Sequence, residues 1–382
     1  MMHHAWMRRV RSIPGLSVLV VACVPLACAA GDYQRDLEEY TVARQRYEEV
    51  SEAHWNLIAE KRRARIAKHR NNEAVVIDDY VLTQPPVYSG PPKPMNPAAP
   101  AEEIGTPATP HVPVVADFLR SAAEHFNFAP QRPQDEMEYK RAYARLAAAA
   151  GLTKEKVVRI YAFEAGGNGT YDVQAGLEQP APGAQAVSTA LGYNQLLATN
   201  SIGLLAEKGG QFIASLRAKA AALSGEAKAV LEAKIPALEQ MVDFCRSVPD
   251  RWSEHQKLAS TPAGLAIHAL ILDVDVGPLL QVQKLVDSVS FAREHGYAQL
   301  DAVELEMMNL TGDGNGLDMI MLPLTMREQV PTSNFFHQGG YERNPVAARN
   351  NVVAQLLAAT AAVMDEQSQL QGAMDLAAAF PN

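Results

Sequence analysis

The sequence predicts a mainly α-helical fold. After residue 115, apolar side chains, most of them alanine and leucine, recur at the three- and four-residue spacing that gives a helix one buried face. That region has no run of alternating apolar and polar residues, which strands would show. Before it, prolines dominate residues 84–113, where the backbone is expected to be extended. With 48% hydrophobic residues in 382, the chain can bury a sizeable core.

The first 30 residues are predicted to be an export signal. Arginines within residues 8–11 precede the apolar run Leu16–Val24, and Ala27-Cys28-Ala29 forms a small-residue cleavage site. The stretch ending at Cys28 is similar to a lipoprotein box, although Pro25 stands where a branched aliphatic residue is usual. Simple cleavage and lipidation of Cys28 with membrane anchoring therefore both stay open. Both place the mature protein in the periplasm, the second as a possible outer-membrane lipoprotein.

Two further segments precede the main domain. Residues 31–75 are predicted to form a charged amphipathic helix, because apolar and aromatic residues recur among Glu, Lys and Arg; they are Leu37, Tyr40, Tyr47, His54 and Ile58. Residues 76–115 are proline-rich and are predicted to be a semi-rigid linker. They are alternatively a clasp that Tyr80, Val87 and Tyr88 anchor along the main domain.

Residues 116–382 are predicted to form one helical domain with long loops at 165–184 and 311–344. Thr153 has the side chain and position of a helix N-cap. Helices are expected at 117–126, 136–150, 154–163, 185–207, 211–222, 226–246, 264–272, 280–295, 302–310 and 345–367.

The segment that indicates chemistry is residues 157–172, in which an apolar helical stretch ends in Glu164 and runs into Gly166-Gly167. The carbonyls at a helix C-terminus and apolar neighbours both disfavour a carboxylate, so the pKa of Glu164 is expected to be raised. A raised pKa suits a general acid, which must hold its proton near neutral pH. The glycines leave room for a bulky polymer to approach.

A second segment, Ala186-Val-Ser-Thr-Ala-Leu-Gly192-Tyr193-Asn194-Gln195, follows the first, and Tyr341 lies later in Gln-Gly-Gly-Tyr-Glu-Arg-Asn. This order resembles that of soluble lytic transglycosylases of the lysozyme-like superfamily. Residues 157–200 carry the resemblance well and the rest only in outline. Ala165 replaces the usual serine, and Tyr193-Asn194 replaces Leu-Met, so the chain is similar to an atypical member of that family.

The resemblance implies a lysozyme-like helical domain that cleaves peptidoglycan between N-acetylmuramic acid and N-acetylglucosamine, leaving anhydro-muramyl ends. Glu164 would be the general acid and base, and Gly192, Tyr193, Asn194 and Gln195 would line the substrate cleft. Tyr341 would help to orient the acid. The resemblance implies no cofactor, and it makes glycan strands and other envelope proteins the expected partners.

Two alternatives stay open. Asp172 is the carboxylate on the loop after Glu164, so a lysozyme-type muramidase could use the two together; Asp172 is otherwise a residue that structures its loop or contacts substrate. A protein that kept the fold but lost turnover would instead be a peptidoglycan-binding scaffold of the envelope. Glu164 is the residue that distinguishes the enzyme from the scaffold.

Other function classes find no support in the sequence. A net charge of −9 without a strongly basic stretch argues against nucleic-acid binding. No phosphate loop, dinucleotide fingerprint or serine elbow is present. Residues 311–318 partly resemble a calcium loop but lack its bidentate glutamate, so a tight glycine turn is expected there. His268 is expected to be a core histidine, Cys245 an inert buried thiol, and no metal is predicted.

Overall fold

The computed structural model describes residues 25–97, 111–178 and 182–381, and these are mainly helical, which confirms the predicted class. Within them, β-structure is limited to isolated bridges such as Gln174 with Leu191. The export signal predicted at residues 1–30 lies outside the described residues except for the start of the first helix, α1 (Pro25–Arg70).

The chain divides into two compact units, and α1 contributes to both. The first unit comprises residues 1–53 and 86–109. In its described part, the ring of Tyr88 meets Tyr40 and Tyr47 of α1 edge to face, at centroid distances of 6.3 and 5.5 Å. The Arg44 guanidinium lies 5.4 Å from the centroid of the Tyr88 ring. The proline-rich segment is therefore fixed to α1 through Tyr88, whereas Val87 is exposed.

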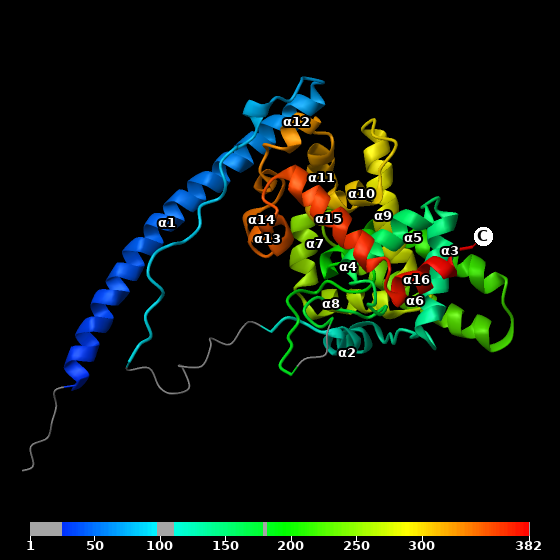
Figure 1. The fold of residues 1–382 in the computed structure, drawn as a ribbon. Helices are drawn as coiled ribbons and strands as arrows, with labels where there is room; N and C mark the ends of the chain where they lie inside the picture. Colours follow the sequence, from blue (N-terminus) through cyan, green and yellow to red (C-terminus); the bar gives the residue numbers. More distant parts are fainter. Residues whose placement is uncertain (1–24, 98–110, 179–181, 382) are drawn as a thin grey trace, which may run out of the picture. The chain divides into compact units, whose positions relative to one another are not determined.

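The second unit comprises residues 54–85 and 110–382 and holds the remaining helices (Figure 1). In chain order these are η1 (Ile77–Asp79), α2 (Val115–Phe126), α3 (Glu136–Ala149), α4 (Lys154–Glu164), α5 (Ala198–Ala221), α6 (Gly225–Cys245), α7 (Trp252–Ala259), α8 (Pro262–His268), η2 (Ala269–Leu272), α9 (Gly277–Glu294), α10 (Ala302–Thr311), α11 (Asp313–Ile320), α12 (Leu324–Arg327), η3 (Thr332–Phe335), α13 (Gln338–Glu342), α14 (Pro345–Arg349), α15 (Val353–Gln367) and α16 (Gln371–Ala379).

Two hydrophobic cores stabilise this second unit. The first core lies among α3, α4, α9 to α11, α15 and α16, and includes Tyr161, Leu305 and Leu356. The second core lies among α2 and α5 to α8, and includes Phe118 and Leu205. Tyr171, on the loop after α4, packs against both cores. That loop therefore lies where the two cores meet.

Several helix predictions were wrong at their boundaries. The helix expected from residue 185 starts only at Ala198, because Gly192 (φ 79°) and Gln195 (φ 43°) are left-handed and fold residues 185–197 into turns. The helices predicted on either side of Gly209 are one helix, α5. A Cβ at Gly209 would overlap the side chain of Val242, so this glycine permits the close packing of α5 on α6.

The loop predicted at 311–344 instead contains α11, α12, η3 and α13, and α7 and α16 were not predicted at all. The helix expected over 345–367 is interrupted between α14 and α15. The tight glycine turn predicted at 311–318 is limited to Gly312 (φ 84°), after which α11 begins.

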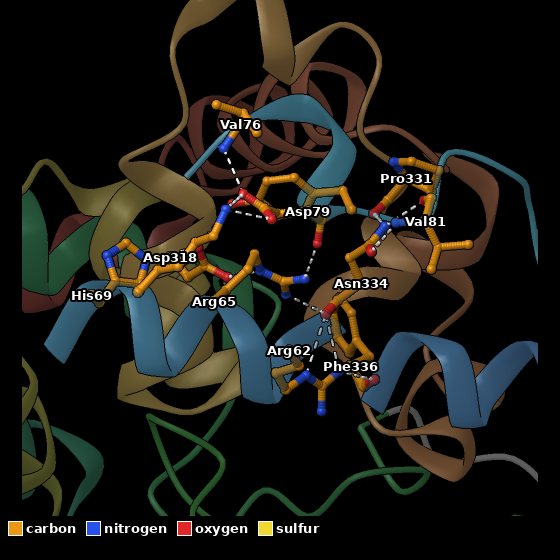
Figure 2. A network of polar contacts seen from close by, with 12 residues as sticks. Arg62, Arg65, His69, Val76, Asp79, Val81, Asp318, Pro331, Asn334 and Phe336 are labelled. Carbon is orange, nitrogen blue, oxygen red and sulfur yellow. Dashed lines mark hydrogen bonds and ion pairs between the residues drawn. The ribbon is translucent and has the colours of Figure 1, made fainter. Parts of the chain in front are cut away.

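A network of polar contacts ties the end of α1 to α11 and η3 (Figure 2). Arg65 is fully buried, and its Nε lies 2.8 Å from Oδ2 of Asp318. Arg65 also donates to the carbonyls of Asp79 (3.1 Å) and Asn334 (3.3 Å), and the Tyr80 hydroxyl donates to Asp318 (2.9 Å). Each of the three nitrogens of the buried guanidinium thus donates to an oxygen. These bonds hold α11 against α1.

Within the described residues, no single helix is long and apolar enough to cross a membrane. The α8–η2 segment and α9 would pass that test together, but they are bent by 95° at their junction.

Candidate active site

Glu164 is the last residue of α4, where the sequence predicted it. The helix starts at the predicted N-cap, because the Thr153 side chain accepts from the backbone N–H of Lys156. Buried residues such as Val157 and Tyr161 hold the other face of α4 in the first core. Glu164 is thereby placed, partly buried, at the C-terminal end of a fixed helix.

A second carboxyl group, that of Glu306 on α10, lies beside Glu164. Glu306 is fully buried, and its carboxyl is within hydrogen-bonding reach of the Glu164 carboxyl. One turn later on α10, Asn309 donates from Nδ2 to Oε1 of Glu164 at 2.7 Å. A capping box between Asp301 and Glu304 fixes the start of α10, so residues 306 and 309 point to the same side of the helix, toward α4.

The pKa values of Glu164 and Glu306 are both raised. Burial raises the pKa of Glu164, against hydrogen bonds from Glu306 and Asn309 that lower it. Burial raises the pKa of Glu306 well above its usual range, and the neighbouring Glu164 charge adds to the effect. Two adjacent carboxyls, one fully and one partly buried, cannot both ionise at ordinary cost. The prediction that the pKa of Glu164 is raised is thus confirmed, and the partner it pairs with is Glu306.

Lys284 on α9 lowers the pKa of Glu306, but its ammonium group is already engaged. Its Nζ donates to Ser288 (3.0 Å) and to Asp313 of α11 (3.4 Å). The ammonium group is thus largely paired elsewhere, and the carboxyl pair sits in a mainly apolar environment.

The loop after Glu164 is held in place from two sides. Gly166 and Gly167 are left-handed, with φ of 61° and 68°. The Tyr161 hydroxyl donates to the carbonyl of Gly169 (2.7 Å), and the N–H of Gly372 donates to Oδ1 of Asn168 (2.9 Å). The loop is therefore a fixed turn supported by α4 and α16.

An open groove of about 360 Å³ begins on this loop. Its wall combines polar and apolar side chains from the loop and from the start of α2, among them Asn168, Thr170, Asp172, Val173, Gln174, Leu177, Glu178, Val114 and Val115. Glu164 itself does not line the groove; Asn168, four residues later, does. The groove offers hydroxyl, amide and carboxylate groups to a polar ligand.

The segment 192–195 lies directly behind the loop. The Tyr193 ring packs edge to face on Tyr161, with centroids 4.8 Å apart, and its hydroxyl donates to Glu136. Asn194 is buried; it accepts from the Tyr143 hydroxyl (2.9 Å) and donates to the carbonyl of Gln281 (2.9 Å). Tyr193 therefore supports α4 from within the core, and Asn194 links α3 to α9.

Gly192 and Gln195 contact neighbouring backbone and side chains in the same region. A Cβ at Gly192 would lie 2.6 Å from Nε2 of Gln281, so a glycine allows that side chain to approach. Gln195 donates from Nε2 to the carbonyl of Val173 (3.1 Å), which belongs to the groove wall. Gln195 thus fixes the backbone of the groove.

Asp172 lines the groove and is engaged by two donors. The Thr170 hydroxyl donates to it at 2.7 Å, and the Arg132 guanidinium pairs with its other oxygen. Tyr341 lies elsewhere in the first core, with ring centroids 5.7 Å from Trp55 and 5.9 Å from Phe336. Among the described residues, no hydrogen bond joins Tyr341 to Glu164.

Sequence reasoning missed Glu306 and Asn309, the residues that contact Glu164 directly. The available signal was Glu306, which is flanked by Leu305 and Met307 in a predicted helix, a position where an unpaired carboxylate is costly if it is buried. In the described part of the chain, no group of three or more His, Cys, Asp or Glu side chains is arranged to hold a metal ion. Comparison with family models, with curated proteins and with solved structures found no match.

Proposed function

We propose that the protein is a lytic transglycosylase that cleaves peptidoglycan glycan strands, with Glu164 as general acid and base. The observation that carries this proposal is Glu164 itself. It sits at the end of α4 with a raised pKa, held by Asn309 and Glu306, and the loop that follows it forms part of the wall of an open groove lined by polar and apolar side chains. The choice of peptidoglycan rests on the resemblance of residues 157–200 to that family.

In the proposed reaction, Glu164 gives its proton to the glycosidic oxygen between N-acetylmuramic acid and N-acetylglucosamine as the bond to the anomeric carbon breaks. The N-acetyl group of the muramyl residue stabilises the positive charge on that carbon. The muramyl C6 hydroxyl then attacks the anomeric carbon and returns its proton to Glu164. One carboxyl group thus acts twice, and the product is an anhydro-muramyl end.

The spacing of the carboxyl groups favours this single-acid route. Glycosidases that use two carboxylates hold them about 5 to 9.5 Å apart, so that a sugar or a water fits between them. Glu306 is in hydrogen-bonding reach of Glu164, which leaves no room for either. Glu306 is therefore not proposed as a nucleophile or base.

Asp172 supports the second candidate, a lysozyme-type muramidase, because it lines the groove near the loop after Glu164. Its pairing with Arg132 and Thr170 favours instead a role in shaping the loop. The lysozyme-like fold, a periplasmic location or outer-membrane anchoring through Cys28, and association with other envelope proteins are parts of the same proposal.

The test is mass spectrometry of the products that purified protein releases from bacterial sacculi. We expect anhydro-muropeptides from the wild type, and a loss of about a hundredfold or more in Glu164→Gln. Glu155→Gln is the matched control, because Glu155 lies exposed on the same helix and pairs only with Arg159. Circular dichroism would verify that both variants are folded.

Three outcomes would contradict the proposal. Products with reducing muramyl ends, lost in Asp172→Asn, would identify a muramidase. Binding to sacculi without any released product would identify a scaffold. Full activity of folded Glu164→Gln would show that Glu164 is not the general acid.

A further inference from the structure

Glu306 is a buried acid that the proposed reaction does not use. Its side chain is fully buried on α10, and neither carboxyl oxygen has a hydrogen-bond partner of good geometry among the described residues; the nearby Asn309 amide lowers the pKa of Glu306 but donates to Glu164 at 2.7 Å. A buried carboxylate without donors is strongly unfavourable. A protonated carboxyl avoids that cost and carries an O–H group that needs an acceptor of its own.

The acceptor available is the Glu164 carboxyl. Asn309 donates to Oε1 of Glu164, and the Glu164 carboxyl, which has a second oxygen, is within hydrogen-bonding reach of Glu306 and can accept from its protonated form. A neutral acid in an apolar site can serve as a hydrogen-bond donor to a neighbouring ionised group.

The charged groups around the pair permit this arrangement. From α9, Lys284 faces Glu306 but is paired with Ser288 and Asp313 of α11. From α4, the charged group in contact is Glu164 itself. From α15, which also packs on α10, the first core receives apolar residues such as Leu356. The pair therefore has no free counterion among these groups that would stabilise two negative charges.

We infer that Glu306 is a positioning residue that stays protonated and donates a hydrogen bond to Glu164. The proton of Glu306 is not transferred in any step. When Glu164 releases its own proton to the leaving oxygen, the Glu306 O–H and the Asn309 N–H both donate to the resulting carboxylate. The catalytic consequence rests on the proposed function; the protonation state of Glu306 does not.

Two substitutions separate this role from the alternatives. Glu306→Gln keeps the shape and places a neutral amide donor beside Glu164, whereas Glu306→Leu keeps similar volume without a donor. We expect Glu306→Gln to retain activity on sacculi within about threefold of wild type and Glu306→Leu to lose about tenfold to a hundredfold, the usual worth of a hydrogen bond to a charged group. Met307→Leu, a buried neighbour on α10, controls for packing.

The pH dependence of activity distinguishes hydrogen-bond donation by Glu306 from a purely structural role. Without the donor, the ionised form of Glu164 is less stable, so in Glu306→Leu the loss of activity at alkaline pH should shift to higher pH. In Glu306→Gln it should stay close to that of wild type. An unshifted profile in a folded Glu306→Leu variant, or abolished activity in Glu306→Gln, would overturn the inference.

Infrared difference spectroscopy tests the protonation state without any substrate. At pH 7 the wild type should show, in addition to any band from Glu164, a protonated carboxyl C=O band that Glu306→Gln lacks and Glu164→Gln retains. If that band is present but sacculi yield no product, the inference about Glu306 stands and the proposed function fails. If the band is absent, Glu306 is ionised and the inference fails, whatever the activity.

Discussion

His268 illustrates, at the scale of a single residue, how burial fixes a protonation state. It is fully buried, as predicted for a core histidine, and its ring meets Phe118 edge to face at 4.9 Å. Its Nε2 donates to the carbonyl of Thr189 (2.7 Å), and Nδ1 accepts from the Ser201 hydroxyl (2.8 Å). Both ring nitrogens are thus satisfied by the neutral tautomer, and burial lowers the pKa to about 4.

This lowered pKa predicts a pH-dependent stability. The folded state resists protonation of His268, so its contribution is fully present above the unfolded pKa of about 6.5 and is lost as the pH falls toward 4. Over that window the loss is on the order of 3 kcal/mol. Urea unfolding at pH 7.5 and pH 4.5 would measure it.

In His268→Gln the difference between the two pH values should be smaller by about that amount, since a glutamine does not titrate. His125→Gln, on the exposed side of α2, is the control and should leave the difference unchanged. Equal pH dependence in wild type and His268→Gln would contradict the assignment of a neutral buried imidazole.

The turn after α4 shows how one element constrains another. Gly166 and Gly167 are both left-handed, but only Gly167 is crowded: a Cβ there would overlap the carbonyl oxygen of Gln367 at the end of α15. Around Gly166 no atom lies within 4 Å of that position. Comparing Gly166 with Gly167 therefore separates the cost of a left-handed backbone from the cost of steric crowding.

We therefore expect Gly166→Ala to reduce the free energy of unfolding by about 1 to 2 kcal/mol, the cost of a left-handed alanine. Gly167→Ala should cost clearly more, because the turn or α15 must also move. Chemical denaturation of the two variants would measure the difference. Equal losses would show that α15 yields freely to the added methyl group.

The contact between α1 and α11 predicts a large effect from one arginine. Arg65→Met would leave the buried Asp318 without its guanidinium partner, although the Tyr80 hydroxyl (2.9 Å) and His69 (3.3 Å) would still contact it. Breaking a buried ion pair on one side costs about 3 to 5 kcal/mol. Arg63→Met, two residues earlier and exposed, should change the unfolding free energy by less than about 0.5 kcal/mol. A similar small effect at Arg65 would mean that the network contributes little.

At the scale of the whole molecule, polar bridges join the two cores of the second unit. The Tyr139 hydroxyl of α3 donates to the carbonyl of Ile271 in η2 (2.9 Å), and Gln281 of α9 donates to the same hydroxyl (2.9 Å). The other side-chain atom of Gln281 accepts from the backbone N–H of Asn194 (2.8 Å). Neither core can separate without breaking these buried bonds.

The two cores should therefore unfold together. Trp55 lies in the first core and Trp252 on α7 beside the second, so each reports on one of them. The variant Trp252→Phe leaves Trp55 as the fluorescent reporter of the first core, and Trp55→Phe leaves Trp252 as the reporter of the second. The two denaturation midpoints should agree once the effect of each substitution on stability is subtracted. Two midpoints well apart would show that the cores unfold independently.

Local signals predicted part of this fold. The cap at Thr153 and the apolar spacing marked α4 closely, and the apolar spacing alone marked α10, because both signals act within one or two turns of chain. The turns at 185–197 were not predictable, because a left-handed Gln195 depends on the hydrogen bond of its side chain to Val173. The fusion of two expected helices into α5 depends on Val242 of another helix.

In the candidate site, too, local features were predictable from the sequence, whereas tertiary contacts were not. Glu164 was predictable because its helix, its glycine turn and its carboxyl are contiguous in sequence. Its contacts with Glu306 and Asn309 were not, since Asn309 lies 145 residues away along the chain. Tyr341 was assigned from a motif alone, and its place beside Trp55 depends on tertiary packing that the motif does not contain.

The bond between Gly372 and Asn168 joins residues 204 positions apart, and it has a consequence for the order of events during biosynthesis. While a nascent chain is still emerging, the turn beside Glu164 has neither this bond nor the neighbouring carbonyl of Gln367 to shape it. The final geometry around the acid can arise only after α16 has been made and has docked. Maturation of the acid is thus a late step, and shortening the chain before residue 372 would leave it incomplete.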